Sequence, residues 1–592
     1  MFRFDHASCF PTYCAFRLDI TRHHVPHKIL DYAELTQQLA DWAKAHPDVV
    51  TLGALGKSRE GRDIPLLIIG LHPDEMRPAV WVDGNMHASE FCGSNAGLAI
   101  AEDMISIHTG KLIANPLPAH MIETLKATLF YFVPRISPDG AEAVLKTGRY
   151  VRSHPADNRA EKGRAYWQNA DVDGDGQMGY MRQVCADGEL VELCDEEGQR
   201  LAPGMLVPRL PEDEGPFYRM YPEGQIVNFD GRSIPTPDYL ADSQTDFNRN
   251  FPYQWGAENA QPGAGHFPGS EPETRAILDF TSAHPNIFAW VNYHTFGGVF
   301  LRPLGDKPDH EMDQGDLAVY QQVESWAKQF TGYPMVSGYH EFQYEPGVPV
   351  RGVLTDYVYH QRGCLAYGVE LWDIFTQIGM KPRKKFIDNY SQMERADYLA
   401  LARWDQRENQ GRIFKPWRAA THRQIGAVEI GGLDLRVGVS NPSYEKLATV
   451  LLQHSAAFLR VAALAPRVTV AVTQQAKLAS GMTRIEIRVA NHGYLGTHGI
   501  SSAKSLPHVE PLRLTTECQG VRLAAPFEAV TQLGHLEGWG RGPYGGVNIF
   551  LPWTRGNGHE KVVTLVVEGS GTLRVKVGSC RVGFQTVVIE VA

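Results

Sequence analysis

The segment PAVWVDGNMHASEF (residues 78–91) joins an almost continuous apolar run to a short polar stretch. Strands that are apolar along their whole length are typical of a sheet covered on both faces. Helical periodicity lies between such runs, as in residues 31–47. The pattern predicts an α/β domain, which we extend from residue 30 to residue 420. The strand-length apolar runs are IPLLIIG (64–70), PAVWVDGNM (78–86), TLFYFVPRIS (128–137), IFAWVNYH (287–294) and CLAYGVELW (364–372).

The composition is that of a globular protein with more than one domain. The chain has 592 residues, 43% hydrophobic and 21% charged, and this length exceeds what one hydrophobic core supports. The net charge of −10 argues against a nucleic-acid surface, which would show clustered Lys and Arg. No apolar run approaches the roughly 18 residues of a membrane span, and we see no signal peptide. The eight cysteines form no CxxC pair, which favours free thiols and a cytoplasmic location.

The rest of the chain divides into regions of different character. Residues 1–29 are interpreted as a leader. Residues 155–245 are rich in Pro, Gly, Asp and Glu and lack periodicity, so we expect an irregular insertion packed around the rim of the site. Residues 421–463 form a connecting segment that contains a helix. Short alternating runs such as TRIEIRVAN predict an all-β, sandwich-type domain over residues 464–592, with a role in self-association or substrate recruitment.

Three residues in this framework are of the types that bind zinc. His87 and Glu90 follow the strand at 78–86 with HxxE spacing, although a capped helix start with a surface histidine explains that spacing equally. His294 ends another apolar strand, and alone it fits an ordinary hydrogen-bonded histidine. In α/β sheets, catalytic groups gather at the carboxyl ends of strands. Two imidazoles and one carboxylate would bind Zn²⁺ and leave a fourth position for water, as in catalytic sites.

Glu370 and the pair Asn248–Arg249 offer complementary chemistry. Glu370 interrupts the strand CLAYGVELW, and a buried carboxylate needs a partner or a task. Beside a metal it would act as general base on the water, whereas an ion pair with a nearby Arg or Lys is the structural alternative. Asn248 and Arg249 present an amide donor and a planar guanidinium, which suit a terminal carboxylate. A polar turn explains the same pair.

In their order and setting, these residues resemble those of the zinc carboxypeptidase A-like family of M14-type metallocarboxypeptidases, and the resemblance spans roughly residues 30–400. It implies a mixed central sheet with helices on both faces and one Zn²⁺ per chain. It also implies removal of single residues from peptides that have a free C-terminal carboxylate. The flanking motifs that carry the resemblance are GKSREGRDIPLLIIG (56–70), SPDGAEAVLKTGRYVR (137–152), FPGSEPET (267–274) and GVELWD (368–373).

The resemblance also implies a role for each residue. Glu370 would be the base, and Arg152 matches the arginine that polarises the scissile carbonyl. Asn248 and Arg249 would bind the substrate's terminal carboxylate. Asp246 matches a carboxylate that orients a zinc-bound imidazole, here that of His87. The zinc ligands would be His87, Glu90 and His294.

The family pattern also implies which residues close over the bound substrate and which select its terminal side chain. A mobile tyrosine lies upstream of an Asp-aromatic-x-Tyr element, which is DYVY (356–359) here. Tyr344 is the expected counterpart, and Tyr339 is the alternative. Thr355 occupies the position that helps to select the terminal side chain, and Gly368 leaves extra room near the base. We therefore expect an uncharged or unusual terminal residue.

A second metal is suggested by DVDGDGQMGYMR (171–182) within the insertion. Its aspartates copy the first half of an EF-hand-like Ca²⁺ loop, but Arg182 stands where a bidentate glutamate is needed. Either another acidic residue completes a Ca²⁺ site or the segment is a plain Asp-Gly turn. The aspartates concerned are Asp171, Asp173 and Asp175.

Two other functions stay open. A zinc amidohydrolase of the aspartoacylase or desuccinylase type, which acts on N-acyl amino acids, shares the HxxE, Asn-Arg, later His and Glu pattern. A binding protein with an inert α/β domain and a partner-recognising β domain would be expected to have lost metal ligands or the base. The fuller agreement with the carboxypeptidase motifs favours the peptidase.

Overall fold

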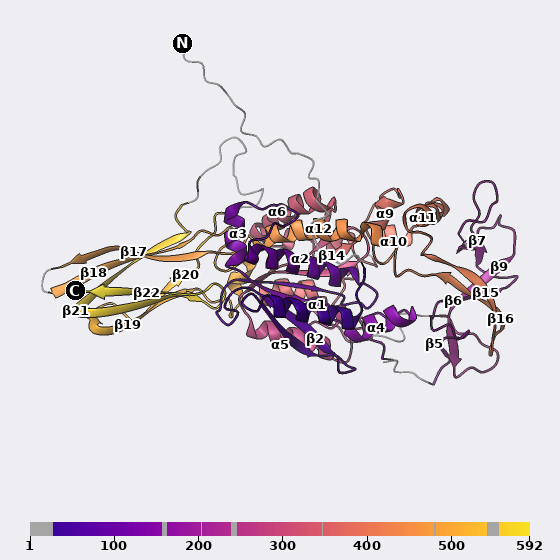
Figure 1. The fold of residues 1–592 in the computed structure, drawn as a ribbon, viewed down its shortest axis with the longest axis horizontal. Helices are drawn as coiled ribbons and strands as arrows, with labels where there is room; N and C mark the ends of the chain where they lie inside the picture. The colour runs from indigo at the N-terminus through magenta and orange to yellow at the C-terminus, as the bar shows by residue number, and fades with distance from the viewer. Residues whose placement is uncertain are drawn as a thin grey trace, which may run out of the picture.

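The computed structural model describes residues 28–156, 163–202, 204–237, 245–345, 347–478, 481–540, 554 and 556–592 (Figure 1). Residues 1–27 of the expected leader lie outside the described residues. Among the helices that are described, none is both long enough and apolar enough to cross a membrane.

A mixed sheet forms the centre of the molecule, as predicted. In the described part of the chain it has eight strands, in the order β1-β2-β4-β3-β11-β14-β12-β13. Strands β4, β3, β11 and β14 run parallel to one another, so their carboxyl ends lie along the same edge. The bounds are β1 (Val50–Lys57), β2 (Asp63–Ile69), β3 (Ala79–Gly84), β4 (Leu129–Val133), β11 (Ile287–Thr295), β12 (Val299–Arg302), β13 (Met335–Ser337) and β14 (Leu365–Leu371).

Helices cover both faces of this sheet. On one face, α12 (Tyr444–Ala462) packs against α2 (Cys92–Thr109) and α6 (Gln314–Thr331), and α1 (Tyr32–Ala45) joins the same core. On the other face lies α5 (Pro272–Ala283). The remaining helices are α3 (Ala119–Lys126), α4 (Pro138–Thr147), α7 (Gly338–Glu341), α8 (Leu354–Tyr357), α9 (Ile374–Gln377), α10 (Asp388–Ser391) and α11 (Arg395–Glu408).

The two cores explain why the central strands are apolar throughout. In β3, Val80 and Val82 join the core that contains α2, whereas Ala79 and Trp81 join the core beneath α5. All four side chains are fully buried. Burial of a large apolar side chain contributes about 1.5–3 kcal/mol, so both faces of the strand stabilise the domain.

The expectation of an irregular insertion at residues 155–245 is wrong. The described residues of this segment contain short strands, and four of these strands join two later ones in a sheet with the order β15-β16-β6-β9-β7-β8. The other two, β5 and β10, pair with each other. Strands of three to six residues with many polar positions give too short a pattern to recognise. Their bounds are β5 (Tyr166–Asn169), β6 (Tyr180–Val184), β7 (Leu190–Glu192), β8 (Leu206–Pro208), β9 (Phe217–Pro222) and β10 (Gly224–Val227).

The domain boundary placed at residue 420 also needs correction. Strand β15 (Phe414–His422) crosses it and pairs with β16 (Gly426–Leu433). Strand β16 then pairs with β6, where Ile430 lies opposite Met181. Both side chains are buried in a small separate core. The β15–β16 hairpin therefore belongs with the insertion, and we call the whole six-stranded unit the insertion sheet.

The predicted all-β region at the C-terminal end is confirmed. Its strands form one antiparallel sheet around a core of its own, and we call this unit the C-terminal sheet. The long β21 pairs with β18 through its first half and with β22 through its second half. The bounds are β17 (Val468–Lys477), β18 (Met482–Asn491), β19 (Leu512–Leu523), β20 (Val530–Gly534), β21 (Glu560–Ser579) and β22 (Gly583–Val591).

A buried arginine anchors the C-terminal sheet to the central domain. Arg581, in the turn between β21 and β22, donates from Nη1 to the carbonyl of Gly363 (3.0 Å) and from Nη2 to that of Arg362 (2.9 Å). These carbonyls lie just before β14, so the anchor is at the amino end of that strand. The insertion sheet lies at the opposite end of the molecule (Figure 1).

We expect Arg581→Met to destabilise the protein. The substitution removes the donor to the buried carbonyl of Gly363, a loss that costs about 1–3 kcal/mol, and a second hydrogen bond to the partly buried carbonyl of Arg362. Urea unfolding measures the change. Arg574→Met is the control, because Arg574 lies in the same sheet but its side chain is 55% exposed. Equal free energies of unfolding for the two variants would contradict the anchoring role.

Candidate active site

The carboxyl ends of the parallel strands bring the predicted residues together. Strand β11 lies between β3 and β14, and His294 near its end is paired in register with Glu370 of β14. His87 and Glu90 lie in the loop from β3 to α2. That loop folds tightly because Gly84 closely approaches the start of α2, where a Cβ on Gly84 would lie 2.5 Å from a backbone carbon.

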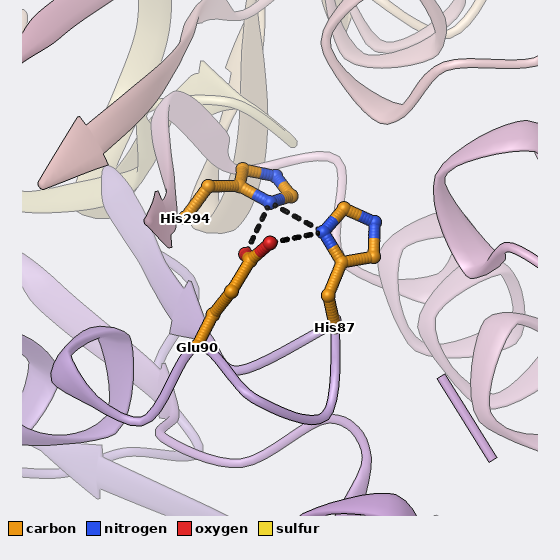
Figure 2. A group of neighbouring side chains, drawn as sticks. All are labelled: His87, Glu90 and His294. Carbon is orange, nitrogen blue, oxygen red and sulfur yellow. Dashed lines mark hydrogen bonds and ion pairs between the residues drawn. The ribbon is translucent and has the colours of Figure 1, made fainter. Parts of the chain in front are cut away.

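His87, Glu90 and His294 point toward a common centre (Figure 2). The Nδ1 atoms of the two rings are 3.1 Å apart. The Glu90 carboxylate places one oxygen 2.8 Å from Nδ1 of His87 and the other 3.0 Å from Nδ1 of His294. All three side chains are buried. Two imidazole nitrogens and a carboxylate are donors that zinc prefers, so the cluster fits Zn²⁺ with a coordination position to spare.

Asp246 sets the protonation of His87 from outside the cluster. Its Oδ1 lies 3.1 Å from Nε2 of His87, so this nitrogen carries the proton and Nδ1 keeps its lone pair. Its Oδ2 accepts from Nε of Arg152 (2.9 Å). Although burial raises the pKa of Asp246, Arg152 and His87 outweigh it and hold the pKa well below its usual value. Asp246 is therefore an anion.

The two glutamates of the site differ in charge. Burial raises the pKa of Glu90, but His87 and His294 lower it well below its usual value. By contrast, burial raises the pKa of Glu370 to about 8, against the lowering effects of His294 and Arg152. No described residue forms a hydrogen bond or ion pair with the Glu370 carboxylate. The ion pair with a nearby Arg or Lys, which was the alternative explanation for a glutamate in this strand, is therefore not found among the described residues. A cation bound in the cluster would favour its anionic form.

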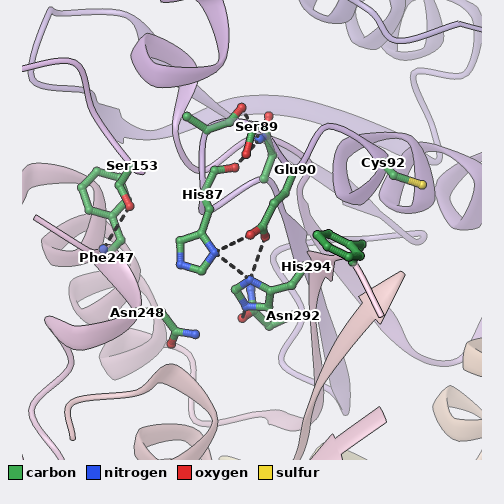
Figure 3. Close-up of polar contacts among 12 residues, drawn as sticks. His87, Ser89, Glu90, Cys92, Ser153, Phe247, Asn248, Asn292 and His294 are labelled. Atoms are coloured by element: carbon green, nitrogen blue, oxygen red, sulfur yellow. Dashed lines mark hydrogen bonds and ion pairs between the residues drawn. The ribbon is translucent and has the colours of Figure 1, made fainter. Parts of the chain in front are cut away.

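Asn248 and Arg249 lie in the short 3₁₀ helix η2 (Phe247–Arg249), which Asp246 caps. The Asn248 amide oxygen accepts from the backbone N–H of Leu354 (2.9 Å), which leaves its Nδ2 group as a free donor among the described residues. Arg249 donates from Nη1 to the Asn248 carbonyl (2.8 Å). Asn248 lies below the two histidines in Figure 3. Both side chains thus keep N–H groups for an anionic ligand.

Arg152 reaches the cluster itself, with Nη1 3.6 Å from the Glu90 carboxylate. Burial lowers the pKa of Arg152, but Asp246 and other neighbours, Tyr344 among them, raise it above its usual value. Tyr344 is 63% exposed, and its effect on the pKa of Arg152 places it within electrostatic range of that guanidinium. Tyr339 packs its ring against His340.

Thr355 and Gly368 are neighbours, in α8 and β14 respectively. A Cβ on Gly368 would lie 3.8 Å from Cγ2 of Thr355 and 3.9 Å from Cβ of Leu301. Asp356, which follows Thr355 in the sequence, is buried and accepts a hydrogen bond from the backbone N–H of Gly305 (3.1 Å). Thr355 and Gly368 themselves bring no charged group to this contact.

Asp171, Asp173 and Asp175 cluster as the sequence suggests, but calcium is not supported. Arg418 of β15 forms ion pairs with Asp173 (2.8 Å) and Asp175 (2.6 Å), so a guanidinium already supplies positive charge. Arg182, at the twelfth loop position, is itself held in ion pairs elsewhere. The contacts of Asp173 and Asp175 with Arg418 fit the alternative interpretation, in which this segment is a plain Asp-Gly turn.

Two residues beside the site were not predicted. Asn292 accepts from Nε2 of His294 through its amide oxygen, and its amide nitrogen donates to Asp83. Figure 3 shows Asn292 next to His294. Both residues lie in strands that are otherwise apolar, and a buried polar side chain in such a strand was the available signal.

The chain matches known sequence profiles in two places. Residues 35–197 and 226–396, more than half of the chain, match the family described as zinc carboxypeptidase. Residues 467–590 match a domain of unknown function, DUF8731.

Individual similar proteins share shorter segments. The zinc carboxypeptidase of Saccharothrix mutabilis subsp. capreolus is 32% identical over 119 residues, which are 20% of this chain and 25% of that protein. The inactive metallocarboxypeptidase ECM14 of Ajellomyces dermatitidis (strain ER-3 / ATCC MYA-2586) is 32% identical over 134 residues, 22% of this chain and 21% of that protein. The match thus spans a quarter or less of these relatives' length. The structure of carboxypeptidase A from Helicoverpa armigera is 20% identical and covers 64% of this chain and 75% of its own, with a TM-score of 0.37.

Proposed function

Because this chain belongs to the zinc carboxypeptidase family, we propose that it is a zinc-dependent metallocarboxypeptidase that hydrolyses the C-terminal peptide bond of its substrates. The observation that carries the proposal is the cluster of His87, Glu90 and His294 beside Glu370. Similar proteins include one whose name describes it as inactive. The case for activity therefore rests on the complete set of groups in this chain.

His87, Glu90 and His294 would bind the metal, each imidazole through Nδ1. Bound there, a zinc ion supplies Lewis-acid chemistry for amide hydrolysis. The contact of His87 Nε2 with Asp246 supports this assignment, because it keeps Nδ1 unprotonated.

Glu370 is the general base of the proposed reaction. It takes a proton from the attacking water and passes it to the leaving amine, while the C–N bond breaks and a new carboxylate forms. Its place beside His294 and the lack of a described partner for its carboxylate support this role. Arg152 stabilises the negative charge that develops on the carbonyl oxygen.

Asn248 and Arg249 bind the terminal carboxylate of the substrate through their remaining N–H groups. Tyr344 covers the bound peptide. Thr355 and Gly368 select an uncharged terminal residue, since neither offers a counter-charge. The substrate is thus a peptide that ends in a free carboxylate and an uncharged side chain.

We expect Arg249→Met to raise the KM for a blocked dipeptide about 10- to 100-fold, since a charge-assisted hydrogen bond contributes about 1.5–3 kcal/mol. Release of the terminal amino acid measures it. Wild-type protein should also discriminate strongly against the same dipeptide with a C-terminal amide.

Arg412→Met is the matched control, because Arg412 pairs with Glu445 away from the cluster. Equal turnover of the acid and the amide, or an unchanged KM in Arg249→Met, would refute carboxylate recognition by this pair. Hydrolysis of N-acyl amino acids in place of dipeptides would refute the peptidase proposal.

A further inference from the structure

We propose that Asn292 fixes the His294 ring for metal binding and that Asp83 in turn fixes Asn292. The three side chains form a hydrogen-bonded relay, Asp83–Asn292–His294, on the inner side of the site. This inference rests on the proposed zinc site and assigns two positioning residues to it.

The inner end of the relay is a carboxylate held by three N–H donors. Asp83 is fully buried, and its Oδ2 accepts from Nε1 of Trp81 (2.6 Å) and Nε1 of Trp290 (3.0 Å). Its Oδ1 accepts from Nδ2 of Asn292. Every one of these partners is a donor, which suits an ionised carboxylate.

Chemistry fixes the direction of the relay. An ionised carboxylate only accepts hydrogen bonds, so the side of the Asn292 amide that faces Asp83 must be its NH₂ group. The amide oxygen must then face His294, and it accepts from Nε2. His294 therefore carries its proton on Nε2 and keeps the Nδ1 lone pair, which points toward Glu90 and His87.

The two histidines are thus oriented by different devices. His87 contacts its carboxylate directly, and that carboxylate, Asp246, also accepts a hydrogen bond from Arg152. His294 reaches Asp83 only through Asn292, and all three lie in the buried strands β11 and β3. The relay makes His294 the rigid ligand, independent of groups that contact substrate.

Zinc affinity tests the relay without measuring hydrolysis. Loss of a residue that orients a metal ligand typically weakens metal binding 10- to 100-fold. We expect that loss in Asn292→Leu, measured by competition with a chromogenic chelator. Asn286→Leu is the matched control, since Asn286 is equally buried at the other end of β11 and donates to the Arg77 carbonyl instead.

A swap of the two relay residues separates orientation from simple packing. In Asp83→Asn the new NH₂ group faces Asn292, which must turn its own NH₂ toward His294 and so force the proton onto Nδ1. We expect zinc binding to weaken about 10-fold or more. In the double variant Asp83→Asn/Asn292→Asp an acceptor faces Nε2 again, and most of the lost affinity should return.

The outcomes distinguish this inference from the proposed function. If the wild-type protein binds no zinc, the proposed function fails and the relay fails with it. If the wild type binds zinc and Asn292→Leu binds it equally, only the relay is refuted. The relay is also refuted if the double variant binds zinc no better than Asp83→Asn.

Discussion

Replacement of Glu370 by Gln is expected to lower kcat by about 10²- to 10⁴-fold, the usual contribution of a general acid–base group. Glutamine has the same shape but cannot accept the proton from water. Zinc binding should persist, because Glu370 lies beside the three ligands and is not one of them. Amino acid release from a blocked dipeptide and metal analysis of the same sample measure both quantities.

Glu273→Gln provides a matched control for that result. Glu273 is also buried, but it lies in α5 and accepts from the backbone N–H of Arg59 (3.0 Å). Its replacement should leave kcat unchanged. If Glu370→Gln with bound zinc turned over at the wild-type rate, another group would have to carry the proton, and the proposed mechanism would be wrong.

Replacement of His87 by Ala should remove both the metal and the activity. Only Glu90 and His294 would remain as ligands, too few for a stable catalytic zinc site. Zinc content after dialysis should fall from one ion per chain to nearly none, and hydrolysis should fall to background. Metal analysis and the dipeptide assay test the two parts separately.

His284→Ala is the control for a lost imidazole. His284 follows α5 at the other end of β11, where its Nδ1 contacts the carbonyl of Phe280 (2.7 Å). That variant should keep its zinc. Hydrolysis retained by His87→Ala without zinc would contradict a metal-dependent reaction.

The central fold could be predicted because its strands are long and buried on both faces. Runs such as IFAWVNYH, of strand length and apolar almost throughout, are typical of strands inside a sheet covered on both faces. The insertion sheet could not be predicted in this way. Its strand β16 alternates buried Val428 and Ile430 with less buried neighbours, and its partner β6 lies far away in the sequence. Pairing between strands that are so far apart in the sequence leaves no local pattern from which it could be predicted.

The candidate site could be predicted as a set of residue types, but its contacts could not. His87, Glu90 and His294 were identified by donor chemistry and by their place at strand ends. The ion pair between Arg152 and Asp246 depends on how two loops fold over the sheet. Asn292 is a single polar residue within an apolar strand, and nothing in the sequence near it indicates its hydrogen bond to Asp83 of another strand.

Strands β11 and β14 carry His294 and Glu370 at paired positions, so one ladder of backbone hydrogen bonds sets the gap between them. Mild heating loosens surface turns before it opens interior strands. Asn248 and Arg249 lie outside the sheet, in the short 3₁₀ helix η2, where both residues are partly exposed. In the proposed mechanism, warming should therefore raise the KM for a peptide before it lowers kcat, and an assay at saturating peptide concentration would miss the change.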